Sequence, residues 1–267
     1  MQDATAVFDT PQPHVRKVPV DRAWRWLTAG WRDLLMSWRQ SLLWGIVPVF
    51  AGWLAAACLL YFDLPYLLLP LGAGFFFIGP FVAVGFYEIS RRRNRGLPTD
   101  FEAIWSAWRR NPDQIALMGC LLLIFHLLWM RIAQLLFALF VWKAIPSWDR
   151  FADVVWYSST SLPFLAAGIL CGAVLSTIVF AVGAFSIPYL LDRGNANLFE
   201  AIATSVAAVR LNAGAMMLWA GLILFFITVG MIPGLLGLVV TVPLIGHATW
   251  HAYRDIVVFP ASGQQDG

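Results

Sequence analysis

Between residues 41 and 250 the chain consists of apolar segments in three pairs, and a short amphipathic stretch precedes each pair. About 20 mostly apolar residues suffice for a helix to cross a bilayer. Sixty per cent of the 267 residues are hydrophobic and 12% are charged, whereas a soluble domain has about 25% charged residues. A chain of this size could not bury so much apolar surface in water. We therefore expect an all-α protein whose helices form a polytopic bundle in a membrane.

Six transmembrane helices are expected in a single membrane domain over residues 21–257. Three prolines in residues 1–20 disfavour regular structure, which predicts a disordered cytoplasmic N-terminus. Residues 258–267 are expected to form a cytoplasmic tail. Pro65 lies in the turn of the first pair, and Gly234 lies in the turn of the last. The expected spans are residues 41–62, 66–87, 115–141, 162–190, 213–228 and 234–250.

The distribution of basic residues predicts the orientation of these spans. Of the 18 Lys and Arg, six precede the first span, six lie between the second and third, and three more are Arg193, Arg210 and Arg254. These fifteen would all be on the inner side if the N-terminus is cytoplasmic, while the outer side would keep Lys143 and Arg150. Because basic residues are enriched in cytoplasmic loops, we expect a bacterial inner-membrane protein with both termini in the cytoplasm.

The amphipathic stretches indicate an internal repeat. Phe101-Glu102-Ala103-Ile104 returns as Phe199-Glu200-Ala201-Ile202, and Thr99 and Asn197 precede these motifs as candidate helix caps. The sequence therefore predicts three units, each an interfacial helix followed by a transmembrane hairpin.

The stretch before the first span has a tryptophan and leucine stripe beside a stripe of arginines. Such a helix is expected to lie in the headgroup plane, where it contacts anionic lipid. Equivalent tryptophan and arginine residues occur before the second pair. The residues expected at the membrane interface are Trp24, Arg25, Trp31, Arg32, Trp105, Trp108 and Arg109.

Each unit also ends alike, with an aromatic residue four positions before an arginine. The pattern is typical of an aromatic belt beside an inside charge. The alternative is that these pairs bind lipid headgroups. The pairs are Tyr87–Arg91, Tyr189–Arg193 and Trp250–Arg254.

Arg131 is a charged residue inside the third expected span. An arginine at the bilayer centre costs roughly 2.5–3.5 kcal/mol on insertion scales, so its side chain should face the bundle or extend outward. One interpretation is a structural ion pair with Asp63, Asp149 or Asp153. The other is binding of an anionic substrate, or coupling, in a transport path.

Three further residues have the chemistry of metal ligands. His247 and His251 are four residues apart on the last expected helix, and Glu88 ends the second span at the same depth. The alternative is that both histidines are interfacial and hydrogen-bonded to loops or headgroups. His126, in the middle of the third span, is expected to be structural, with a proton relay as the alternative.

Glycines mark two of the spans. Gly168 and Gly172 form a GxxxG pattern, which favours close helix packing. Gly79 and Pro80 predict either similar packing or a broken helix that lines a cavity.

The sequence contains no phosphate-binding loop, nucleophile elbow or dinucleotide fingerprint. We therefore expect no enzymatic activity, no cofactor and no nucleic-acid partner. The favoured interpretation is a non-catalytic accessory or organising protein, in a membrane protein complex or a homo-oligomer. A small transporter or channel that uses Arg131 is the alternative, and a metal- or haem-dependent enzyme would depend on His247, His251 and Glu88 alone.

Short motifs along the chain are familiar from other proteins. Near the N-terminus these motifs are Val15-Arg16-Lys17-Val18, Trp24-Arg25-Trp26-Leu27 and Gly30-Trp31-Arg32-Asp33. The third span contains Trp129-Met130-Arg131. The membrane domain ends with Gly246-His247-Ala248-Thr249-Trp250-His251-Ala252-Tyr253-Arg254-Asp255. Over about residues 15–257 the chain resembles a bacterial family of predicted integral membrane proteins, known only as a domain of unknown function. The resemblance implies a multi-pass inner-membrane protein and no particular activity.

Some members of that family carry a cytochrome c oxidase subunit I label. The chain has four histidines, and His14 lies before the first span. These are too few for the haem and copper ligands of that subunit. A link to respiration would therefore be that of an accessory or assembly partner.

Overall fold

The computed structural model describes residues 13–64, 67–141 and 161–259. Residues 1–12 of the predicted N-terminal segment 1–20, residues 260–267 of the predicted tail 258–267, and Asp149 and Asp153 lie outside these ranges. Within the segment predicted to be disordered, His14–Val15 form a short strand. Four described helices are long and apolar enough to cross a membrane. They are α2 (Trp38–Tyr61), α6 (Pro112–Val141), α8 (Ser161–Gly183) and α11 (Ala213–Met231). The chain is thus a helical membrane bundle, as predicted.

Three of the six expected spans, the second, the fourth and the sixth, have a different form. The second is divided at Ala83 into α3 (Leu68–Val82) and α4 (Val84–Asn94). The sixth corresponds to α12 (Leu238–Ile256), which is more polar than the four long helices. A similar division separates α8 from α9 (Ser186–Asp192). The interruption at Ala83 follows Gly79 and Pro80, as expected of residues that weaken a helix.

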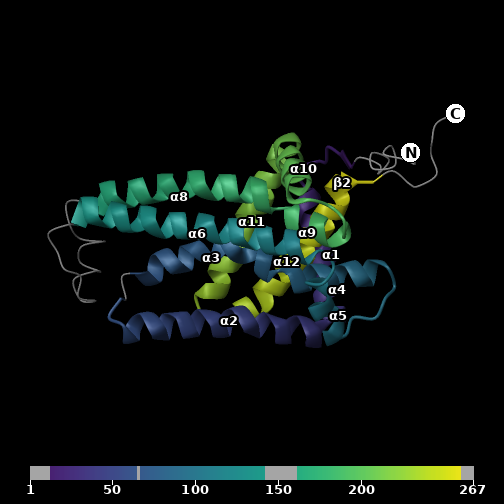
Figure 1. Ribbon diagram of the computed structural model, residues 1–267, viewed down its shortest axis with the longest axis horizontal. Helices are drawn as coiled ribbons and strands as arrows, with labels where there is room; N and C mark the ends of the chain where they lie inside the picture. Colours follow the sequence, from purple (N-terminus) through teal and green to yellow (C-terminus); the bar gives the residue numbers. More distant parts are fainter. Residues whose placement is uncertain (1–12, 65–66, 142–160, 260–267) are drawn as a thin grey trace, which may run out of the picture.

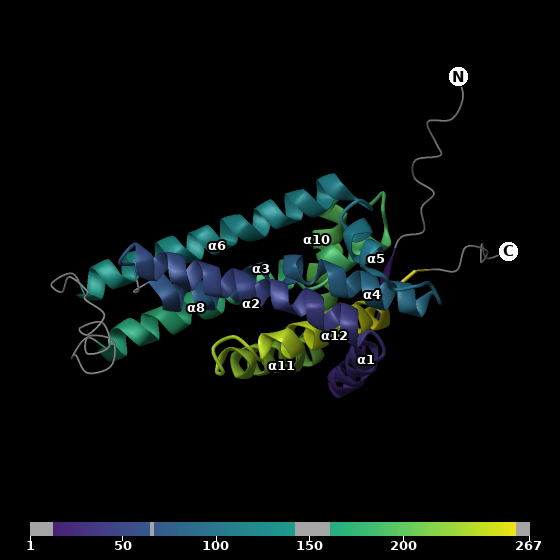
Figure 2. The ribbon, with the colours of Figure 1, turned by 90° about the horizontal axis from the view of Figure 1, so that it is seen from below.

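The amphipathic stretches form α1 (Arg22–Met36), α5 (Phe101–Ala107) and α10 (Leu198–Leu211). All three lie at the same end of the bundle, which also carries α4 and α9 (Figures 1 and 2) and is called the polar end below. Asn197 caps α10, since its side chain accepts a hydrogen bond from the Glu200 amide at 2.9 Å. This confirms the second of the two predicted caps. α5 begins after Asp100 rather than after Thr99.

Both ends of the described chain meet at the polar end. Strand β1 (His14–Val15) pairs antiparallel with β2 (Val257–Val258), with His14 opposite Val258. The Arg16 amide extends the ladder by donating to the Ile256 carbonyl at 2.8 Å. The two ends of the described chain therefore lie side by side.

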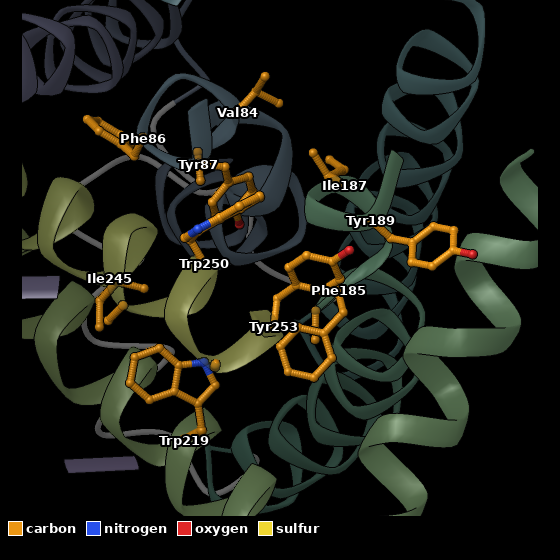
Figure 3. Close-up of a cluster of buried hydrophobic side chains, with 14 of the residues drawn as sticks. Val84, Phe86, Tyr87, Phe185, Ile187, Tyr189, Trp219, Ile245, Trp250 and Tyr253 are labelled. Atoms are coloured by element: carbon orange, nitrogen blue, oxygen red, sulfur yellow. The ribbon is translucent and has the colours of Figure 1, made fainter. Parts of the chain in front are cut away.

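The core at the polar end forms where α4, α9 and α12 meet (Figure 3). Tyr87, Tyr189 and Trp250, the aromatic residues of the three unit ends, are only 2%, 1% and 1% exposed. The predicted aromatic belt is therefore wrong at these positions. The short helices α4 and α9 pack against α12, so these side chains are buried in contacts between helices instead of facing the lipid.

Helix α12 is the centre of this packing, since it contacts α1, α2, α4 and α11. Glycines allow three of these close approaches. A Cβ atom on Gly30 would lie 2.6 Å from the Ala248 nitrogen, and one on Gly45 would lie 2.5 Å from the Val239 oxygen. On Gly246 it would lie 2.7 Å from Phe86 Cβ.

Candidate functional site

A buried polar network joins α1, α2, α4 and α12 at the polar end. The Ser90 hydroxyl lies 2.6 Å from Asp33 Oδ2 and 2.8 Å from His247 Nδ1. His247 Nε2 lies 2.9 Å from the Ser41 hydroxyl. All four side chains are buried, and Ser41, Ser90 and His247 are fully inaccessible. Since buried polar groups are costly unless hydrogen-bonded, this network helps to define how the four helices pack.

The hydrogen bonds place a proton on Nδ1 of His247. Ser90 has one hydroxyl proton, which it donates to the Asp33 carboxylate. Ser90 must then accept a hydrogen bond from His247 Nδ1. Because complete burial favours the neutral ring, His247 Nε2 accepts a hydrogen bond from the Ser41 hydroxyl. Both ring nitrogens are thus engaged within the protein.

Asp33 is the acidic centre of the network. His251 Nε2 donates to Asp33 Oδ2 at 2.8 Å, and Arg93 Nε donates to Oδ1 at 3.0 Å. Burial alone would raise the pKa of Asp33. The hydrogen bonds from His251 and Ser90 outweigh burial and hold this pKa below its ordinary value.

Glu88 does not join the two histidines. It is completely buried and forms a bidentate pair with Arg91, at 2.7 Å to Nε and 2.6 Å to NH2. Arg92 Nε donates to the same carboxylate at 2.9 Å. His247, His251 and Glu88 are therefore held by three different sets of partners. Among the described residues, no group of three or more His, Cys, Asp or Glu side chains is placed to hold a metal.

Two further carboxylates form ion pairs between separate segments at the polar end. Asp192 pairs with Arg95 at 2.8 Å and with Arg254 at 2.9 Å. Asp255 pairs with Arg16, and with Arg22 at 3.0 Å. Arg254 thus acts in an ion pair between α9 and α12, which differs from its predicted role as the inside charge of an aromatic belt.

Most of the residues predicted at the membrane interface are exposed. Trp24, Arg25, Trp31 and Arg32 lie on the exposed face of α1, and Trp105 and Arg109 are exposed around α5. Trp108 differs, because it is half-buried against Phe81 with ring centroids 4.6 Å apart. Leu34 is buried, and the exposed apolar stripe consists of Trp24, Trp31, Leu35 and Trp38.

Arg131 is exposed on α6, where its NH1 donates to Gln134 Oε1 at 3.1 Å. No ion pair joins it to Asp63. The other predicted acidic partners, Asp149 and Asp153, fall outside the described ranges.

A large apolar cavity of about 1460 Å³ lies between α3, α6 and α8 on one side and α11 and α12 on the other. Its wall includes Gly79 and Pro80, as the broken-helix interpretation of that span predicted. Gly168 and Gly172 also line it. A Cβ atom on Gly168 would meet no atom within 4 Å, so the prediction of close helix packing is wrong for this glycine. A Cβ atom on Gly172 would lie 3.2 Å from the Trp129 ring, so this glycine does allow a close approach.

The cavity is continuous with the outer surface of the bundle. Ile169 of α8 and Met217 of α11 belong to its wall, and they are 71% and 75% exposed. Its few polar wall residues include Asp63 and Gln134 toward the end opposite the polar end. Such a wall suits a hydrocarbon chain better than an ion or a polar metabolite.

His126 has the structural role expected from the sequence. It is buried, and its Nδ1 donates to the Gly74 carbonyl at 3.1 Å. A Cβ atom on Gly74 would lie 2.2 Å from the imidazole ring. The glycine therefore makes room for the histidine between α3 and α6.

These features define a helical integral membrane protein with a hydrogen-bonded polar end and an apolar cavity between its helices. Residues 68–192, from the start of α3 to the end of α9, match the model of a family described as predicted integral membrane protein, DUF2189. The match confirms the family resemblance found in the sequence and supports a membrane protein family of unknown function. No curated protein and no solved structure matches the chain.

Proposed function

We propose that this protein is a non-catalytic organiser of the bacterial inner membrane, which binds lipid acyl chains in the cavity between α8 and α11. The cavity, at about 1460 Å³, is the observation that carries the proposal. Small-molecule pockets usually measure about 300–1,000 Å³, so this one has room for a long-chain ligand. Because Ile169 and Met217 are both wall residues and exposed, a chain could enter sideways from the bilayer.

We further propose six spans in three repeated units, with both termini in the cytoplasm. The β1–β2 pair supports an even number of crossings, because it brings both chain ends to one side. In each unit an amphipathic helix precedes two segments that run away from the polar end and back. The basic residues from Arg16 to Arg39 and from Arg91 to Arg110 support a cytoplasmic polar end.

The cavity proposal can be tested by filling the cavity. Gly168 and Gly221 line it from opposite helices, and a Cβ atom on either would meet no atom within 4 Å. The double variant Gly168→Leu, Gly221→Leu should keep its fold but copurify with less lipid in mild detergent, as measured by native mass spectrometry. Ala166→Leu is the matched control, because Ala166 is exposed on α8 and is not a wall residue. Equal lipid content in all three proteins would contradict the proposal.

Native electrophoresis of the detergent extract tests an accessory role in the same membranes. Co-migration with a larger complex would identify the organiser as an accessory subunit. Migration alone would leave lipid as the binding partner and exclude a stable complex in that detergent.

Transport is the second candidate function, and one observation favours it. Gln134, the partner of Arg131, lines the cavity together with Asp63. An anion that reached the cavity from this end would meet these polar groups first. Flux measurements on reconstituted protein, with Arg131→Gln for comparison, would distinguish transport from lipid binding alone.

A further inference from the structure

A second, smaller pocket of about 240 Å³ lies between α1 and α12 at the polar end, separate from the apolar cavity. The wall residues from α1 are three or four positions apart and therefore share one helix face, and the two wall residues from α12 are four positions apart. Figure 2 shows these two helices beside each other. The wall residues are Arg22, Arg25, Trp26 and Ala29 from α1, and His251 and Asp255 from α12.

The one carboxylate of this pocket is already neutralised. Asp255 pairs with Arg16 and, at 3.0 Å, with Arg22, and its Oδ2 accepts a hydrogen bond from Trp26 Nε1 at 2.9 Å. Arg25 is exposed and forms no ion pair within the described ranges. The pocket therefore has a surplus of positive charge, and the Arg25 guanidinium is available to an incoming anion.

His251 adds a fixed polar group to the same wall. Its Nε2 is committed to Asp33 at 2.8 Å, which holds the imidazole in one orientation. Its other ring nitrogen makes no hydrogen bond within the part of the chain that the structure describes. In the imidazolium form that nitrogen is a donor.

The neighbouring side chains place the pocket at the level of lipid headgroups. Trp24 and Trp31 are exposed on α1, and Trp and Tyr concentrate at the boundary between headgroups and hydrocarbon. An amphipathic helix with this composition lies in the interfacial plane. An anion at this depth would lie within reach of the arginines of α1.

We propose that the pocket between α1 and α12 binds a phosphate group, held mainly by the Arg25 guanidinium and assisted by Arg22 and His251. Guanidinium groups bind phosphate through paired, charge-assisted hydrogen bonds. The phosphate belongs either to an anionic phospholipid or to a free cytoplasmic anion, since both present the same oxygens. This proposal does not depend on the apolar cavity or on what occupies it.

The test uses full-length protein in dodecylmaltoside and counts bound phosphatidylglycerol by native mass spectrometry. Arg25→Gln should weaken phosphatidylglycerol binding about tenfold, because it removes a charge-assisted contact. Arg32→Gln is the matched control, since Arg32 is exposed about two turns further along α1 and does not line the pocket. The control should change binding less than twofold. Arg22 is left unchanged because its loss would also break the ion pair with Asp255.

Competition with inorganic phosphate distinguishes the two sources. Phosphate that displaces phosphatidylglycerol from the wild type, but not from Arg25→Gln, would identify a site for phosphate in either form. Binding that resists phosphate but is lost in Arg25→Gln would identify a lipid site. Equal weakening by Arg25→Gln and Arg32→Gln would overturn the proposal, because general attraction to the α1 surface would then explain binding. The cavity-filling double variant should bind phosphatidylglycerol at this pocket normally.

Discussion

Asp33 of α1 and His251 of α12, which are 218 residues apart in sequence, form a hydrogen bond of 2.8 Å at the polar end. The same Asp33 oxygen accepts a hydrogen bond from the Ser90 hydroxyl of α4 at 2.6 Å. One carboxylate thus connects the amphipathic helix α1 to two helices of the bundle. Apolar packing through Ala23, Trp26 and Leu34 buries the same face of α1. The position of α1 therefore depends on both kinds of contact.

Replacing Asp33 by Asn should destabilise the protein by about 2–4 kcal/mol, since it breaks a largely buried pair with Arg93 and places an amide among three donors. Unfolding by sodium dodecyl sulfate in dodecylmaltoside, followed by tryptophan fluorescence, would measure the change. Asp113→Asn is the control, because Asp113 is exposed in the first turn of α6. It should cost less than about 1 kcal/mol. Equal effects of both variants would show that the network contributes little.

The pH dependence of stability should reveal the same carboxylate. The pKa of Asp33 is lowered from its ordinary value of 3.8, so the folded state favours the ionised form. The resulting stabilisation is fully present above the unfolded-state pKa and is lost as the pH falls through the lower, folded-state pKa. Wild-type unfolding midpoints should therefore decline below about pH 4 more steeply than those of Asp33→Asn. Other carboxylates titrate in both proteins, so the difference between the curves isolates Asp33. Parallel curves would contradict the assigned ionisation.

Much of the fold was predictable because membrane insertion imposes simple rules on length and polarity. The four long helices coincide with apolar segments seen in the sequence. The environment of the aromatic residues that end each repeated unit was less predictable. A tyrosine next to a glutamate, as at Tyr87 and Glu88, is compatible with either the membrane interface or the protein core. What decides its burial is the interruption at Ala83 and the packing of α4 against α12. Tertiary contacts of this kind leave no periodic signal in a single sequence.

Of the residues in the polar network, the sequence analysis singled out only His247 and His251, and it grouped them with Glu88, which has other partners. His247 and His251 share a helix, yet they bind Ser41, Ser90 and Asp33, whose positions depend on other helices. A local signal for Asp33 did exist. It lies on the face of α1 that includes Ala23, Trp26 and Gly30, and an acid on an otherwise buried face requires a partner. Nothing local identifies that partner.

Arg131→Gln should leave the stability of the protein within about 1 kcal/mol of the wild type, because Arg131 is exposed and its described partner is the single amide of Gln134. The same unfolding titration would measure this. Reconstitution into liposomes that contain a trapped anion then tests whether the charge has a function. Arg109→Gln, an exposed arginine at the polar end, is the control for loss of positive charge. A large loss of stability would instead indicate a structural ion pair with a residue outside the described ranges.

Two glycine substitutions should have opposite effects because their surroundings differ. A methyl group on Gly30 would lie 2.6 Å from the nitrogen and 2.8 Å from the Cα of Ala248, which are backbone atoms of α12 that cannot rotate away. Gly30→Ala should therefore force α1 from α12 and cost about 1–3 kcal/mol. A methyl group on Gly221 would meet nothing within 4 Å, so Gly221→Ala should be neutral or stabilising by up to about 1 kcal/mol, through helix propensity. Unfolding midpoints of the two variants would provide the comparison. If Gly30→Ala were as stable as Gly221→Ala, α1 would not pack against α12 through this glycine.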